Sequence, residues 1–317
     1  LALGSAEVTL AEQAAAYPTI HSADENGLPI GWGALSGLAA DHAAPGKLFS
    51  ITDSAYAPSR ILEIDAAAKP AKIAGAITVT KDGKPAAYDL EGIAVRAGGG
   101  FWLASEGNPE KKDGPLPDLL LRVSAKGEVE EEIRLPEELA KHAVRFGFEG
   151  VTVTGTGAEE TVWLAVQREW KDDPKGKTKI LSYKPATKAW GVLHYPLTQP
   201  ASGHWMGLSE LVSLGDDRFA VIERDNAFGA KAFKTIQAFS VKGLTPAAIG
   251  SADIPTVAKS LLRDLTPDLM KAGGYGLDKV EGMTVDKAGN LFVVTDNDGV
   301  DDSSGETQFF AFGPLPR

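Results

Sequence analysis

The sequence predicts an all-β fold, a single β-propeller with five blades on the count of repeats and six blades as the alternative. The first observation is a short frame that recurs along the chain and in which a glutamate precedes an apolar run. The second is the spacing of this frame, about 55 to 70 residues, which fits propeller blades. The third is the nature of the apolar runs, which are rich in aromatic and β-branched residues and too short for helices.

The recurring frame supplies the innermost strand of each blade. It is anchored by Glu91, Glu149 and Glu281, with a looser copy at Glu210 and a fifth copy that carries Ser36 at the glutamate position. We expect these five residues at equivalent starts of the innermost strands. Each carboxylate has a structural alternative, in which it accepts hydrogen bonds from backbone N–H groups of the neighbouring blade.

Further strands follow each frame in the same order. The second strands are expected at 48–53, 101–106, 162–167, 218–223 and 291–296, and the third at 60–64, 119–123, 179–183, 235–239 and 308–312. Outer fourth strands are visible at 128–133 and 190–195. Glycine-rich turns join the first two strands, as in β-hairpins. Three to four antiparallel strands per repeat is the blade of a propeller.

The two ends of the chain and one long segment complete the predicted architecture. We expect one domain over residues 1–317, with 1–30 as an N-terminal extension whose residues 7–10 add an outer strand and close the ring. Residues 254–262 and 266–272 are the best helix candidates, and we expect them as a short helical insertion on one blade. Six blades stay open as an alternative because the stretch 211–280 is long and the N-terminal 35 residues are hard to place in a blade.

Composition excludes several classes of protein. The net charge of −11 argues against a nucleic-acid partner, which calls for a basic surface. Cysteine is absent, so thiolate metal sites and disulfides are excluded. No run of 18 apolar residues predicts a membrane span. The opening residues, apolar and then small, favour the tail of an export signal over an ordinary terminus, so we expect a periplasmic or secreted protein. We also expect a monomer.

The repeated motifs resemble those of the phytase-like family. The resemblance is carried by Asp89-Leu90-Glu91-Gly92, Arg145-Phe146-Gly147-Phe148-Glu149-Gly150, Gly207-Leu208-Ser209-Glu210-Leu211, Phe219-Ala220-Val221-Ile222-Glu223-Arg224-Asp225, Asp278-Lys279-Val280-Glu281-Gly282 and Val294-Thr295-Asp296-Asn297-Asp298. It covers residues 30–312, nearly the whole chain. The resemblance implies a propeller, a calcium-dependent phosphoester hydrolase with esterase-like activity, and an exported bacterial protein.

Blade geometry gathers carboxylates on one face of the predicted propeller. The start of a first strand and the end of the antiparallel second strand lie on the same face, so the following groups should approach one another: Glu91 and Glu106; Glu210, Glu223 and Asp225; Glu281, Asp296 and Asp298; Ser36 and Asp53; Glu149, Gln167 and Arg168. Two like charges about 4 Å apart repel by roughly 4 kcal/mol at an effective dielectric constant near 20. Such a cluster raises its pKa values, pairs with arginine or binds a metal.

Hard oxygen donors without cysteine favour Ca²⁺ or another hard ion, such as a lanthanide. The five histidines show no paired spacing, which argues against zinc. The candidate metal ligands are Glu91, Glu149, Glu210, Glu281, Asp53, Glu106, Glu223, Asp225, Asp296 and Asp298.

Three residues are candidates for catalysis. Glu281 is the first choice for a working carboxylate, because its blade also supplies Asp296 and Asp298. Arg145 can hold an anionic substrate, with pairing to the glutamates as the alternative. His204 is a candidate general acid or phosphate contact, although a lone loop histidine is more often neither.

Three functions follow from these residues. The first is a metal-dependent phosphoester or ester hydrolase, in which the metal offsets substrate charge and activates water. The second is a non-catalytic protein that binds a hard metal ion or a metal complex. The third is an interaction propeller with one fixed ion. The expected ligand is a small anionic or metal-complexed molecule, and no G-x-S-x-G motif supports a serine hydrolase.

Overall fold

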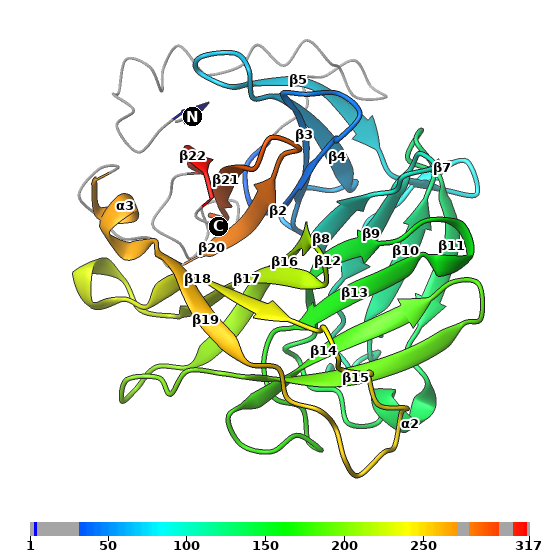
Figure 1. Ribbon diagram of the computed structural model, residues 1–317. Coiled ribbons are helices and arrows are strands. Elements are labelled where there is room, and N and C mark those ends of the chain that lie inside the picture. Colours follow the sequence, from blue (N-terminus) through cyan, green and yellow to red (C-terminus); the bar gives the residue numbers. More distant parts are fainter. Residues whose placement is uncertain (1–2, 5–31, 272–278, 298–306, 316–317) are drawn as a thin grey trace.

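The computed structural model describes residues 3–4, 32–271, 279–297 and 307–315, and it is a five-bladed β-propeller (Figure 1). Five sheets of four strands follow one another along the chain. The innermost strands of successive sheets pack side by side, and the last packs against the first, which closes the ring. The predicted fold class is therefore confirmed, with five blades. No helix within the described ranges is long and apolar enough to cross a membrane.

The first three blades each run outward from the axis in chain order. Blade I contains β2 (Leu35–Ala40), β3 (Lys47–Thr52), β4 (Arg60–Asp65) and β5 (Lys72–Thr78). Blade II contains β8 (Leu90–Val95), β9 (Phe101–Ser105), β10 (Leu119–Val123) and β11 (Val129–Arg134). Blade III contains β12 (Phe148–Thr154), β13 (Thr161–Val166), β14 (Lys177–Lys184) and β15 (Ala189–Pro196). A small hairpin, β6 (Thr80–Lys81) with β7 (Lys84–Pro85), connects blades I and II.

The last two blades complete the circle. Blade IV contains β16 (Met206–Gly215), β17 (Arg218–Asp225), β18 (Lys234–Ser240) and β19 (Lys259–Asp264). Blade V contains β20 (Val280–Val285), β21 (Asn290–Thr295), β22 (Phe309–Pro314) and β1 (Leu3–Gly4). The helical segments are short: α2 (Glu137–Ala140), α3 (Thr266–Lys271) and the 3₁₀ turns Gly157–Glu159 and Gly229–Lys231.

The N-terminus contributes an edge strand to blade V. Leu3–Gly4 pairs in parallel with Phe309–Phe310 of β22, whereas the other strand pairs of the five blades are antiparallel. The predicted edge strand at residues 7–10 lies outside the described residues.

The helix expected at residues 254–262 is wrong. The end of this segment is part of β19, which pairs antiparallel with β18 and forms the outer strand of blade IV. The open edge of β18 offers backbone N–H and C=O groups that must be paired, and this requirement outweighs local helix propensity. The second predicted helix is present as α3.

Five clusters of buried apolar side chains fill the five interfaces between blades. The cluster between blades II and III contains Trp102 and Phe148, which are fully buried. Blades V and I meet around Phe292 and Leu35 in the same way. The apolar core of this fold therefore lies between neighbouring sheets, and polar side chains line the channel at the axis.

Glycine in the recurring frame allows the innermost strands to approach closely. A Cβ atom on Gly150 would lie 2.8 Å from the Cα atom of Glu210, in the next blade. A Cβ atom on Gly92 would lie 2.8 Å from the backbone nitrogen of Val151. Real Cβ atoms do not approach backbone atoms this closely, so the glycine of the frame sets the diameter of the ring.

We expect Gly150→Ala to lower the free energy of unfolding by about 3 kcal/mol, because the added methyl group forces apart two backbones that cannot move independently. Gly98→Ala is the matched control, since nothing lies within 4 Å of its Cβ position and its backbone needs no positive φ. This control should change stability by less than about 1 kcal/mol. Chemical denaturation of both variants measures the difference, and equal stabilities would show that the close approach is unimportant.

Candidate functional site

A local irregularity turns the frame residues toward the axis. In each blade the pairing of the two innermost strands shifts register within the frame, for example between Leu90 and Gly92 and between Val280 and Gly282. Such a bulge leaves one residue out of the ladder and re-aims its side chain. The residues left out include Ser36, Glu91, Glu149 and Glu281, as the recurrence predicted.

Blade IV differs from the predicted frame by one residue. Its register shift lies between Leu208 and Glu210, so Ser209 is the equivalent of the frame glutamates, and Glu210 takes the position of the glycine. The predicted equivalence of Glu210 is therefore wrong. Fully buried, its carboxylate accepts hydrogen bonds from the backbone N–H groups of Leu211 (2.9 Å), Leu38 (3.2 Å) and Met283 (3.2 Å). Glu210 thus ties blade IV to blades I and V.

Glu281 is one half of a buried ion pair. Its Oε1 atom lies 2.5 Å from Nη2 of Arg224, and Arg224 Nε donates to Ser209 Oγ at 2.7 Å. Burial alone would raise the pKa of Glu281, but the positive charges of Arg224 and Lys279 outweigh it and hold that pKa below its usual value. Asp296 shares a hydrogen bond with Glu281, and burial together with the Glu281 charge holds the Asp296 pKa well above its usual value. The predicted approach of Glu281 and Asp296 is confirmed.

The two remaining carboxylates of blade IV are neutralised within the blade. Glu223 accepts from Lys259 Nζ at 2.7 Å and from the hydroxyl of Tyr195 at 2.7 Å. Asp225 lies 3.0 Å from Lys234 Nζ. Lys234 begins β18 and Lys259 begins β19, whereas the predicted group drew only on the two innermost strands of the blade. Among the described residues, Glu210, Glu223 and Asp225 do not form the expected group of three converging carboxylates.

Glu149 and Gln167 meet in the channel as predicted. The side-chain amide of Gln167 donates to Oε1 of Glu149, whereas Oε2 of Glu149 is buried with no partner in the described part of the chain. Burial, followed by the charges of Glu106 and Glu281, raises the Glu149 pKa well above its usual value. Hydrogen bonds from the described residues therefore reach only one of the two carboxylate oxygens of Glu149.

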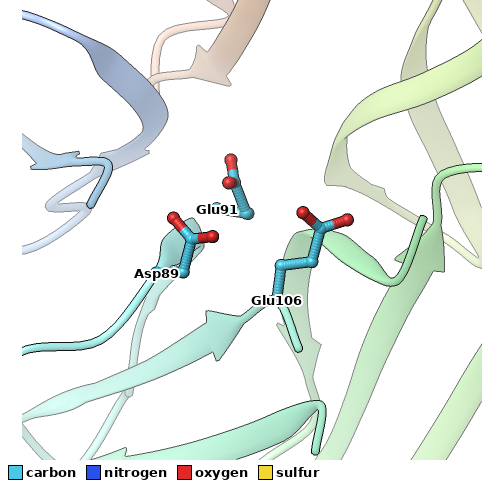
Figure 2. A group of neighbouring side chains, drawn as sticks. All are labelled: Asp89, Glu91 and Glu106. Atoms are coloured by element: carbon cyan, nitrogen blue, oxygen red, sulfur yellow. The ribbon is translucent and has the colours of Figure 1, made fainter. Parts of the chain in front are cut away.

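Three carboxylates converge at the start of blade II. Oxygen atoms of Asp89, Glu91 and Glu106 all lie within 4.8 Å of one another, and Figure 2 shows the three groups gathered around one point. Asp89 precedes β8, Glu91 belongs to β8, and Glu106 follows β9. We name Asp89, Glu91 and Glu106 the acidic triad. The predicted approach of Glu91 and Glu106 is confirmed.

The acidic triad receives little compensation. Glu106 accepts from the backbone N–H of Gly147 at 2.8 Å, and Asp89 accepts from that of Ser54 at 3.2 Å. No lysine or arginine among the described residues forms an ion pair with the triad. Burial raises the pKa of Glu106 to about 8, and Asp89 contributes by repulsion. Burial, followed by the charge of Glu149, also raises the Glu91 pKa well above its usual value.

A pocket of about 570 Å³ lies beside the acidic triad. Asp89 and Glu106 form part of its wall, and Tyr56 and Tyr88 contribute aromatic surface. Arg145 also lines the pocket, with an exposed side chain. The pocket therefore combines two carboxylates of the acidic triad with one guanidinium group.

The other predicted site residues lie elsewhere. Asp53 accepts from the backbone N–H of Ala55 at 2.7 Å, and its charge contributes to the raised pKa of Asp296 in the neighbouring blade V. His204 is exposed, and its Nδ1 atom lies 3.3 Å from the side-chain oxygen of Asn226. His204 does not line the pocket. Asp298 lies outside the described residues.

Sequence reasoning missed Asp89 and Asp118 as site residues. Asp89 stands two positions before Glu91, and side chains two apart along an extended chain point to the same side, so the alternation could have identified it. Asp118 is buried behind Glu106, where it accepts from the backbone N–H groups of Gly107 and Phe148. Burial raises its pKa to about 6. Asp118 directly precedes β10, and no sequence motif identifies it.

The chain belongs to the phytase-like family, because the family model described as "Phytase-like: Esterase-like activity of phytase" matches residues 30–299. This description indicates a propeller of the hydrolase type. No curated protein matches the chain.

Several solved structures are similar to this chain at low sequence identity. The Bacteroides ovatus xyloglucan PUL GH43B is 9% identical, with a TM-score of 0.49 over 90% of this chain and 52% of that one. The Bombyx mori GH32 beta-fructofuranosidase is 11% identical, with a TM-score of 0.46 over 90% of this chain and 63% of that one. The major allergen Mala s 1 of Malassezia sympodialis is 14% identical, with a TM-score of 0.39 over 94% and 82%. The chain thus spans less than two thirds of the first two proteins.

We expect the metal-free protein to lose stability as the pH rises from about 5 to about 8. Glu106 and Asp118 have folded-state pKa values above those of the unfolded chain, so the folded protein holds their protons more tightly than the unfolded chain does. The stability that this difference contributes is complete at low pH and is lost as each carboxyl group ionises. Glu106→Gln should flatten the upper part of this profile, by on the order of 3 kcal/mol between pH 5 and pH 8.5. Thermal melts in chelator measure the profile.

Glu130→Gln is the control for this experiment, because Glu130 lies on an outer strand and pairs with Arg122 at the surface. Its pH profile should match that of the parent protein. A Glu106→Gln profile that also matches the parent would show that Glu106 ionises normally.

We expect Glu281→Gln to lower the free energy of unfolding by about 3 kcal/mol, since the buried guanidinium of Arg224 would lose its carboxylate partner. Replacing the pair together, as Arg224→Met with Glu281→Gln, should restore part of the stability because no unpaired charge is left. Chemical denaturation of the parent, the single variants and the double variant measures the coupling free energy between Arg224 and Glu281. A single variant within about 0.5 kcal/mol of the parent would contradict this role of the ion pair.

Proposed function

We propose that this chain is an exported, metal-dependent hydrolase of phosphoric or carboxylic esters, with its active site at the acidic triad and the adjoining pocket. The observation that carries the proposal is the acidic triad itself, three converging carboxylates without a cationic partner among the described residues, beside a pocket that presents Arg145. Membership of the phytase-like family supports the reaction class.

The donors of the acidic triad fit a hard cation. All are carboxylate oxygens, the ligands that Ca²⁺ and lanthanide ions prefer, and one ion can contact all three groups at the separations observed. The raised pKa values of Glu91 and Glu106, which result from burial and from repulsion between carboxylates, support the binding of a positive charge at this point. A bound Ca²⁺-like ion would offset the charge of a phosphoryl or acyl oxygen and lower the pKa of bound water.

The residues of the pocket would hold and orient the substrate. Arg145 can donate two parallel hydrogen bonds to an anionic group and so draw it toward the acidic triad. Tyr56 and Tyr88 provide a surface for the organic part of the ester. Glu281 remains a candidate catalytic residue from the sequence, but its partnership with Arg224 favours a structural role.

We expect the chelated protein to be inactive toward p-nitrophenyl phosphate and p-nitrophenyl acetate, and Ca²⁺ or Tb³⁺ to restore hydrolysis of at least one. Glu91→Gln should weaken metal affinity by about tenfold or more, because one of three charged donors is lost. The same variant should lose hydrolytic activity in parallel. Calorimetric titration and initial rates measure the two effects.

Glu130→Gln again serves as the control and should keep both properties. Metal binding without hydrolysis of any ester would favour the alternative, a non-catalytic protein that binds a hard metal ion. Full activity in chelator would contradict metal dependence.

A further inference from the structure

Arginine and aromatic side chains alternate in a row that begins at Arg145, on the wall of the pocket. Arg145 lies 6.0 Å from the ring centre of Phe146, and Arg168 lies 4.7 Å from the same ring. Arg168 is also 5.1 Å from the ring of Trp205, which Arg224 approaches at 5.2 Å. The row therefore runs from the wall of the pocket, at Arg145, to the ion pair of the channel, at Arg224.

Arg168 and Arg145 both lack an anionic side-chain partner among the described residues, and Arg168 differs from the exposed Arg145 in being half-buried. Arg224 is bonded to Glu281, and elsewhere Arg96 is bonded to Glu160. No carboxylate in the described residues accepts a hydrogen bond from the Arg168 guanidinium, and its Nε atom is buried without any partner. The two Nη atoms of Arg168 are not among the buried unpaired atoms, so a ligand can reach them. Because a partly buried guanidinium without an acceptor is costly, a ligand that accepts hydrogen bonds from these Nη groups would gain binding free energy.

The nearest acidic neighbour does not fill this role. Glu169 follows Arg168 in the chain, and its Oε1 atom accepts from the backbone N–H of Gly176 at 2.9 Å. Glu149, in the adjacent channel, is held by Gln167. The half-buried guanidinium of Arg168 is therefore held by two rings and left open for an external acceptor.

We propose that Arg168, supported by Phe146 and Trp205 and assisted by Arg145, is a binding site for an oxyanion of the phosphate type. Aromatic contacts restrict the guanidinium and leave its N–H groups to form a fork that matches two oxygens of a phosphate. Because Arg145 lines the pocket and contacts the same Phe146 ring, the site adjoins the pocket. On the proposed function, it would hold a second anionic group of the ester substrate.

Binding of inorganic phosphate to metal-free protein tests the site without any turnover. We expect calorimetric titration to show binding that weakens with salt, and Arg168→Gln to weaken it at least tenfold. Arg168→Lys, which keeps the charge but lacks the fork, should give an intermediate affinity. Acetate and sulfate titrations distinguish a carboxylate site from a tetrahedral oxyanion site, and acetate binding as tight as phosphate binding would overturn the phosphate assignment.

Arg218→Gln is the matched control for loss of one arginine charge. Arg218 begins β17 and pairs with Gly215, at the opposite end of the blade from Met206 and Asp225. The control should bind phosphate like the parent. Unchanged phosphate affinity in Arg168→Gln, or no binding of phosphate to the parent protein at millimolar concentration, would overturn the proposal. If Arg168→Gln does not fold, the affinity of Arg168→Lys decides, and parental affinity in that variant overturns the role of the fork.

Ester kinetics separate this site from the active site. With Ca²⁺ present, Arg168→Gln should raise KM at least tenfold for a substrate that carries two phosphate monoester groups, with kcat unchanged. The kinetics of p-nitrophenyl phosphate, which carries one phosphate group, should not change. Equal effects on both substrates would contradict a separate second site. Phosphate binding without any hydrolysis would reject the proposed function and leave the oxyanion site intact.

Discussion

The structure depends on how carboxylates that converge on one axis are compensated. Five strands begin at the same end of the channel, and a repeated acidic position brings like charges together in a poorly solvated space. Blade IV resolves this with backbone N–H groups around Glu210, and blade V with Arg224 against Glu281. At blade II, within the described residues, the acidic triad accepts hydrogen bonds from only two backbone N–H groups, those of Gly147 and Ser54. The uncompensated charge thus marks the part of the ring that is suited to a cation.

Backbone packing places the functional groups as firmly as the charges do. The frame glycines let neighbouring innermost strands touch, and the bulge beside each glycine directs the preceding side chain to the axis. Because five blades repeat this geometry, a difference in side chains from blade to blade gives each sector of the channel its own chemistry. The pocket lies where blade II combines its carboxylates with Arg145, which precedes blade III. Function is therefore a local variation on a symmetric scaffold.

Much of this arrangement could be predicted from the sequence, because strand order and alternation are local. The approach of Glu91 to Glu106 needs only two antiparallel strands and a turn. The one-residue displacement of Glu210 could not be predicted, since a bulge changes register without any change in the apolar pattern. Lys259 was missed as the partner of Glu223 because its segment reads as helix and becomes a strand only against the edge of β18. Long-range partners such as these are decided by packing.

The most direct test of the account is anomalous diffraction from a crystal of the protein soaked in Tb³⁺. The account predicts a strong anomalous peak among the oxygens of Asp89, Glu91 and Glu106, and its loss in Glu91→Gln crystals treated in the same way. A peak at the carboxylates of blade IV or V, or no ordered ion in the channel region, would contradict the claim that the acidic triad is the metal site.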